Sequence, residues 1–193
     1  MAGARDPFWN RLLEVSDVLV YSFDFEVLER PLGVEAYATE APWLPAFVVP
    51  DATVSVVGRN GMGAVYASCQ RDAIQCCLHI DPRGTVVRVG DDLQQVVALV
   101  VALPYWPELL AQYPGGGLSA LRDVAQRLER EACDDFLQLP AAREELQTFL
   151  QLPTLADPVR HLYELAFEQP PVTVWSPHGW RYESQVLRGW ASP

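Results

Sequence analysis

Apolar and polar side chains alternate through the middle of the chain, which indicates β-strands. Residues 53–57 are rich in β-branched side chains, and residues 74–80 place apolar side chains at every second position. Turn sequences separate these runs: a glycine-rich stretch at 58–63, and Asp81-Pro82-Arg83-Gly84, in which proline is preset for the second turn position. Residues 53–89 are therefore predicted to form a meander of antiparallel strands.

The region before the meander is less regular. Asp6 is a suitable N-cap and Pro7 suits the first helical position, so residues 6–15 predict a short helix. Residues 18–23 are β-branched and aromatic and predict a strand. Several prolines interrupt residues 24–50, where we expect loops and one short element, held on the core by Trp43 and Phe47.

After the meander, the apolar period changes to that of helices. Residues 93–103 predict a buried helix that opens at Asp91 and Asp92, and a further helical turn is expected over 108–113. Three amphipathic stretches follow from residue 118 onward, the last opened by Asp157-Pro158. Residues 172–175 and 180–183 flank a turn sequence and predict a small hairpin.

These elements together predict an α+β fold with a mostly antiparallel central sheet packed by helices. The chain has 193 residues, half of them hydrophobic, which is enough for a substantial core. We expect residues 1–113 to form the α+β core. Residues 118–193 are expected to form a helical extension with the terminal hairpin, packed on the same domain.

Charge restricts the partners that the chain can bind. The formal net charge is −11, and all 14 cationic residues are arginines. Residues 1–51 carry a net charge of −6 and residues 108–193 carry −5, whereas residues 52–107 are neutral. A nucleic-acid or anionic-membrane surface needs a basic footprint, so we expect neither partner. The negative electrostatic field of the chain favours a basic protein partner, although many acidic domains are acidic only for solubility.

The residues that usually carry chemistry are scattered along the sequence. No two cysteines form a C-x-x-C motif, and the three histidines lie far apart in sequence. The cysteines are Cys69, Cys76, Cys77 and Cys133. We therefore expect free buried thiols, no metal, no cofactor and no catalytic residue. The N-terminus shows no apolar signal region, so a cytoplasmic location is expected.

Two local patterns suggest chemistry but have simpler interpretations. The glycines at 58–63 have the wrong spacing for a phosphate-binding loop and precede a strand rather than a helix, so a turn is favoured. Cys77 and His79 resemble a nucleophile and its base. Residues two apart on one strand are about 7 Å apart, however, which favours an inert packed pair.

One stretch resembles the SUKH superfamily. The residues are Val56-Val57-Gly58-Arg59-Asn60-Gly61-Met62-Gly63-Ala64-Val65-Tyr66-Ala67, an apolar strand, a glycine turn and a strand with an aromatic residue. A hairpin over 80–90 and a helix over 93–103 follow in the order typical of that superfamily. The resemblance covers about residues 45–113, and Gly61, Gly63 and Tyr66 would carry over as fold residues only.

The resemblance implies an α+β fold and, for many bacterial members, an immunity protein that neutralises a toxin by binding it. Other members are eukaryotic regulators or scaffolds. Ala64 stands where an acidic residue is frequent, and the resemblance does not explain the chain from residue 118 onward.

The resulting hypothesis is a non-catalytic binding protein whose acidic surface covers the active site of a basic toxin domain, for example a nuclease. The expected contact residues are Asp91, Asp92, Glu108, Asp134 and Asp135, with Trp106 as an aromatic anchor. Two alternatives stay open: a regulatory or scaffold module without a toxin partner, and an enzyme of unrecognised type.

Overall fold

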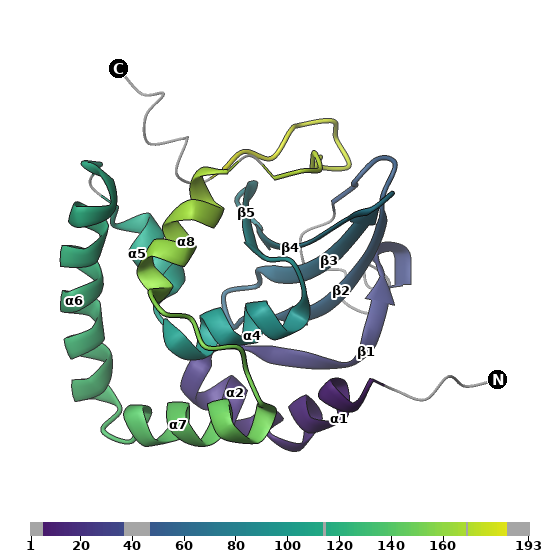
Figure 1. Cartoon of the computed structure of the whole chain (residues 1–193). Helices are drawn as coiled ribbons and strands as arrows, with labels where there is room; N and C mark the ends of the chain where they lie inside the picture. The colour runs from purple at the N-terminus through teal and green to yellow at the C-terminus, as the bar shows by residue number, and fades with distance from the viewer. Residues whose placement is uncertain (1–5, 37–46, 114, 169, 185–193) are drawn as a thin grey trace.

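The computed structural model of the chain describes residues 6–36, 47–113, 115–168 and 170–184. Its centre is a five-stranded antiparallel sheet in the order β1-β2-β3-β4-β5, in which each strand pairs with its neighbour in sequence (Figure 1). The strands are β1 Glu26–Gly33, β2 Thr53–Arg59, β3 Val65–Arg71, β4 Ile74–Asp81 and β5 Thr85–Gly90. The predicted α+β fold and its meander are confirmed.

Helices cover one face of this sheet (Figure 1). The chain opens with α1 Pro7–Glu14 and α2 Ser16–Phe23, and after β5 it continues with α4 Leu93–Ala102, α5 Trp106–Ala111, α6 Gly117–Asp135, α7 Leu139–Leu150 and α8 Pro158–Phe167. Asp6 caps α1, Asp92 caps α4 and Asp157 caps α8 through side-chain hydrogen bonds, and the caps of α1 and α8 are each followed by a proline, as the sequence predicts.

Residues 16–23 are helical, so the predicted strand at 18–23 is wrong. Leu19 and Phe23 are buried one helical turn apart, whereas Val18, Val20 and Tyr21 are exposed. That burial follows a helical period, which a strand with alternating faces would not produce.

The residues before β2 also differ from expectation in part. β1 occupies residues left unassigned in the sequence and carries Pro31, which is tolerated because β1 is an edge strand with a register shift between Val27 and Leu32. Phe47 is buried, as expected of an anchor, while Trp43 lies outside the described residues.

The glycine-rich stretch divides between a strand and a turn. Gly58 belongs to β2, where a side-chain Cβ would approach the backbone oxygen of Glu26 to 2.9 Å. The turn itself is held by Asn60, whose side-chain oxygen accepts hydrogen bonds from the backbone N–H groups of Met62 (3.2 Å) and Ala64 (2.9 Å). Only its last glycine, Gly63, has a positive φ, at 82°.

Buried side chains form one cluster on each face of the sheet. The helix-covered face joins α1, α2, α4 and α5 to residues of α6, α7 and α8, including Leu121, Leu146 and Leu162. The described helices before residue 113 and those after residue 116 thus share this cluster. The opposite face is covered by residues near Phe47 and by the segment 172–182, which pairs through an isolated antiparallel bridge between Trp175 and Arg181.

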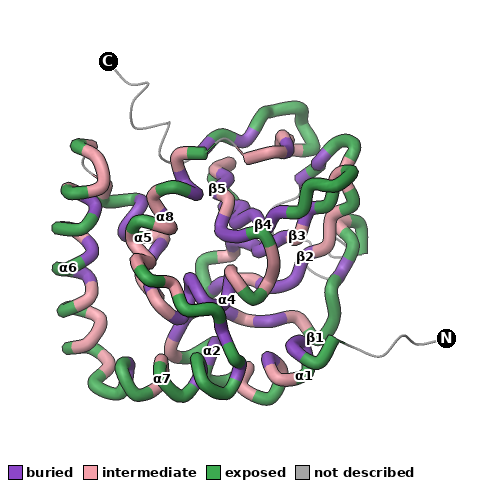
Figure 2. The backbone as a smooth tube through the Cα atoms, viewed as in Figure 1, coloured by how far each residue is buried: buried purple, intermediate pink, exposed green. Residues whose placement is uncertain are grey.

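Side-chain burial follows this layering (Figure 2). The inner strands and α4 are largely buried, whereas α6 exposes much of its outer side. In the part of the chain that the structure describes, no helix is both long and apolar enough to cross a bilayer.

Candidate functional site

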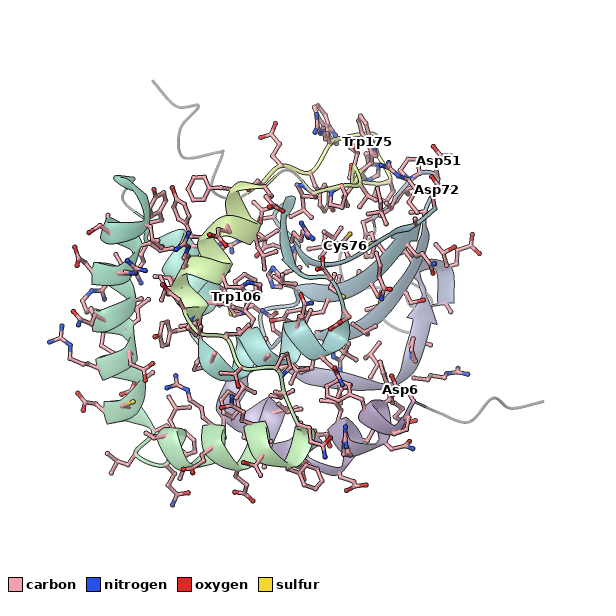
Figure 3. All side chains as sticks on the ribbon, in the orientation of Figure 1. Asp6, Asp51, Asp72, Cys76, Trp106 and Trp175 are labelled. Carbon is pink, nitrogen blue, oxygen red and sulfur yellow. The ribbon has the colours of Figure 1, made fainter. Side chains whose placement is uncertain are left out.

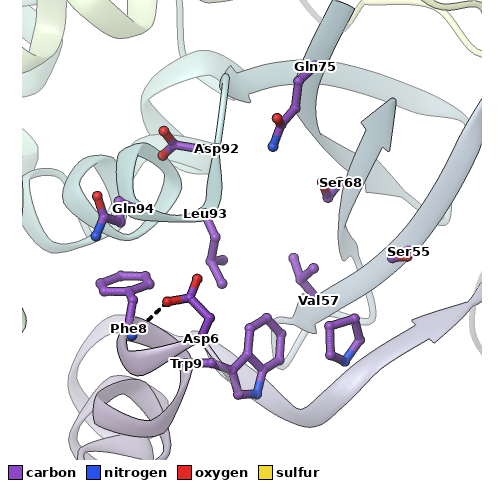
Figure 4. A pocket seen from close by; sticks show the side chains of 11 residues that line it. Asp6, Phe8, Trp9, Ser55, Val57, Ser68, Gln75, Asp92, Leu93 and Gln94 are labelled. Atoms are coloured by element: carbon purple, nitrogen blue, oxygen red, sulfur yellow. Dashed lines mark hydrogen bonds between the residues drawn. The ribbon is translucent and has the colours of Figure 1, made fainter. Parts of the chain in front are cut away.

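A surface depression of about 510 Å³ lies where the first turns of α1 and α4 meet the helix-covered face of the sheet (Figure 4). Four strands and two helices contribute to it. Its lining residues are Asp6, Phe8, Trp9, Pro31, Ser55, Val57, Ser68, Gln75, Asp92, Leu93 and Gln94. We call it the α1–α4 depression.

The floor of the α1–α4 depression is polar because, at this end of the sheet, polar side chains replace apolar ones on the helix-covered face. Val57 belongs to the buried cluster under the helices, and Ser55 is two residues away on the same face of β2. Ser55 is paired in register with Ser68 of β3, and Gln75 follows near the start of β4. In Figure 4, the Gln75 side chain extends from β4 toward the helices.

Two carboxylates line the depression, and both are helix N-caps. Asp6 Oδ1 accepts a hydrogen bond from the backbone N–H of Phe8 at 2.9 Å, and Asp92 Oδ1 accepts one from that of Gln95 at 2.8 Å. Within the described ranges, Oδ2 of each carboxylate accepts no hydrogen bond from the protein. Capping therefore fixes each carboxylate and leaves one oxygen available.

Aromatic and aliphatic groups form the walls. Trp9 is only 7% exposed, and its indole N–H donates to the backbone oxygen of Glu29 at 3.2 Å, which fixes the ring against β1. Phe8 and Leu93 stand at the starts of α1 and α4, on either side of the opening (Figure 4). The depression thus combines fixed apolar walls with negative charge.

Charge in the lining has one sign. Among the lining residues that the structure describes, Asp6 and Asp92 are charged and none is an arginine or a histidine. The N-terminal end of a helix carries partial positive charge, which offsets part of each cap's charge without cancelling it. This arrangement suits a cationic group with an apolar stem.

Of the residues predicted as contacts, Asp92 is the one that lines the depression. Its neighbour Asp91 is exposed but paired with Arg88, which also pairs with Glu168. Asp91 is therefore largely neutralised within the protein.

Trp106 does not lie on a contact surface. It is 1% exposed in the core, where its ring centroid lies 4.6 Å from that of His79 and 6.5 Å from that of Tyr66 (Figure 3). The expectation that Trp106 anchors a partner is corrected, because its ring is already buried by the protein itself. The sequence signal, an aromatic residue between two prolines, does not distinguish a core residue from an exposed one.

The other predicted acids lie elsewhere. Glu108 is exposed on α5, and Asp134 and Asp135 are exposed at the end of α6, next to Leu137, which is 84% exposed. The corner between α6 and α7 and the start of α4 lie on different sides of the molecule (Figure 1). The structure therefore does not bring the predicted contact residues together into one surface.

The two side chains that resemble a nucleophile and its base are both buried. Burial raises the pKa of the Cys77 thiol to about 12, despite a hydrogen bond with Ser68, and burial lowers the pKa of His79 to about 4. Both changes favour the neutral forms of the side chains, as expected for an inert packed pair.

A pair of thiols lies on the opposite face of the sheet. Cys69 and Cys76 face each other across β3 and β4, and a hydrogen bond between them raises the pKa of Cys69 and lowers that of Cys76. Both thiols are buried in the second core cluster. Among the described residues, no group of three His, Cys, Asp or Glu side chains could hold a metal ion.

Several lining residues were not singled out from the sequence. The sequence predicts Asp6 only as a helix cap. Trp9, Ser55, Ser68 and Gln75 fit ordinary helix and strand patterns. Ser55 shares its face of β2 with Thr53 and Val57, so alternation along this strand gives no signal of a site. The approach of α1 to the start of α4 has no local sequence signal.

Comparison with known proteins adds no relative. The chain matches no protein-family model, no curated protein and no solved structure.

Proposed function

We propose that the chain is a non-catalytic protein-binding domain of the immunity type, which neutralises a toxin by occluding a basic active site. The α1–α4 depression carries this proposal, because it is an open, preformed site that combines carboxylates with fixed aromatic walls.

The rest of the molecule supports a partner of opposite charge. The net charge of −11 would attract a basic domain over distances beyond direct contact and raise the rate of association. Toxins that cleave nucleic acids bind a polyanionic substrate, so their active sites are expected to be basic. An acidic surface placed over such a site would compete with the substrate.

The order of elements also supports the proposal. β2 and β3 are joined by the glycine turn, β4 and β5 follow as a hairpin, and α4 packs on the sheet next. This is the order of elements on which the resemblance to the SUKH superfamily rests. Immunity by binding is the function that the resemblance implies.

Coexpression with a toxin tests the proposal. The candidate toxin is the product of the gene adjacent to this one in the source genome, expressed in a host that it kills. We expect growth to be restored when this chain is coexpressed, and the purified proteins to form a complex whose affinity falls as NaCl concentration rises.

Three outcomes of this test would contradict the proposal. The first is no rescue although both proteins are present. The second is a complex whose affinity does not change with salt, which would contradict the electrostatic mechanism. The third is rescue accompanied by covalent change of the toxin, which would favour the enzyme hypothesis instead.

A further inference from the structure

We propose that the α1–α4 depression is a receptor for one arginine side chain of the protein partner. This inference rests on the proposed function and assigns the chemistry of its site. The observations that carry it are the two available carboxylate oxygens, the fixed aromatic wall and the polar floor.

The carboxylates suit a guanidinium group. Asp6 and Asp92 each use one oxygen for helix capping, which holds the carboxylate in place, and each has Oδ2 left to accept a hydrogen bond. A guanidinium group is planar, always charged, and offers five N–H donors. It can therefore donate to more than one acceptor at once, which a compact ammonium group does less well.

The walls suit the remainder of an arginine side chain. Trp9 is immobilised by its hydrogen bond to Glu29, and Leu93 and Val57 supply aliphatic surface. The methylene stem of arginine packs well against such surface. Ser55 and Gln75 offer side-chain oxygens for N–H groups that the carboxylates do not reach.

The overall charge of the depression agrees with this occupant. Because none of the described lining residues is cationic, the two carboxylates face an opening in which these residues supply no counter-ion. An incoming arginine supplies that charge.

The inference can be tested without knowledge of the partner. The probe is N-acetyl-L-arginine N-methylamide, titrated into the ¹⁵N-labelled chain and followed by NMR. We expect saturable shifts of the Trp9 indole N–H and of the Leu93 and Gln94 amides, with a dissociation constant on the order of millimolar, since so small a probe makes few contacts.

Two further probes define the chemistry. The citrulline analogue has nearly the same shape but no charge, and the lysine analogue has the charge without the planar fork. We expect no saturable shift with citrulline and at least several-fold weaker binding with lysine. Equal responses to arginine and citrulline, or shifts spread evenly over the acidic surface, would overturn the inference.

Paired substitutions keep the test independent of folding. Asp6→Asn with Asp92→Asn removes both charges but retains two good N-cap residues. The matched control is Asp17→Asn with Asp51→Asn, which removes two exposed carboxylates outside the depression, at positions where asparagine is also tolerated. We expect the first pair to weaken binding of the arginine probe at least tenfold and the control pair less than twofold.

The same variants separate this inference from the proposed function. If the Asp6/Asp92 variant loses both the arginine response and toxin neutralisation, both proposals are supported. If the variant loses the arginine response but still neutralises the toxin fully, the partner does not use this depression. The arginine inference then fails while the proposed function stands.

Discussion

His79 lies in the core with its ring against Trp106 and Tyr66, 4.6 Å and 5.1 Å away between centroids. Its Nε2 atom is buried without a hydrogen-bond partner among the described residues. Burial lowers its pKa to about 4, while Asp81 opposes this change and Arg83 adds to it. The folded protein therefore holds a neutral imidazole over a pH range in which an unfolded chain would protonate it.

This shift predicts a loss of stability in mild acid. Above pH 6.5 the imidazole is neutral in both states. As the pH falls from 6.5 toward 4, the unfolded chain takes up a proton that the folded protein does not. Between pH 7.5 and 5 we expect His79 to lower the free energy of unfolding by about 2 kcal/mol. Urea denaturation of the parent and of His79→Gln measures the difference.

Cys77→Ala is the matched control, because Cys77 is buried on the same strand and its pKa, raised to about 12, lies outside the range tested. It should destabilise the protein but keep the parental pH dependence. A His79→Gln variant with unchanged pH dependence would show that another group is responsible. The measurements stop at pH 5 so that protonation of carboxyl groups contributes little, because the ordinary pKa of these groups lies about one unit lower.

At the scale of elements, Arg143 attaches α7 to α4 and α6. It forms a two-armed ion pair with Glu129 at 2.5 and 2.9 Å, and its Nε donates to the backbone oxygen of Val101 at 3.1 Å. The hydroxyl of Tyr105 donates to the same carboxylate at 2.9 Å. These hydrogen bonds lower the pKa of Glu129, so the carboxylate stays charged well into acid.

Arg143→Lys should destabilise the protein by about 1–3 kcal/mol, because an ammonium group cannot reproduce both arms and the contact with Val101. The control is Arg160→Lys, since Arg160 pairs with Glu164 one turn further along the exposed side of α8. That substitution should leave stability nearly unchanged. Thermal and urea unfolding measure both; equal effects would mean that α7 is not held by this ion pair.

The sequence was sufficient for elements whose burial follows a local pattern. The meander and the helix caps could be predicted because alternation, turn residues and Asp-Pro pairs act within a few residues. Residues 16–23 could not, because their β-branched and aromatic side chains favour a strand while contacts with the core select a helix. β1 was missed because Pro31 argues against a strand unless the strand lies at an edge.

The candidate site was less predictable than the fold. The α1–α4 depression combines residues from α1, β1, β2, β3, β4 and α4 that are as far apart as Asp6 and Gln94 in sequence. Its acids also serve as helix caps, so their local pattern is fully explained without a binding role. Sequence reasoning consequently favoured acids in adjacent pairs, of which Asp91 is engaged by Arg88.

At the scale of the whole molecule, negative charge is spread over several surfaces. The depression lies where the starts of α1 and α4 meet the sheet, and Asp134 and Asp135 lie at the end of α6, before the corner that leads into α7. A single partner of ordinary size covers about 800 Å² of one protein. The proposed function assigns docking to the depression and long-range attraction to the α6–α7 corner.

Stoichiometric titration of toxin activity distinguishes binding from catalysis most directly. Increasing amounts of this chain are added to a fixed amount of the toxin from the adjacent gene, and the remaining toxin activity is measured at several times. We expect activity to fall in proportion to the added chain, to reach zero at equimolar amounts, and to return when high salt separates the two proteins. Progressive inactivation by far less than one equivalent, persisting after separation, would contradict a mechanism based on occlusion.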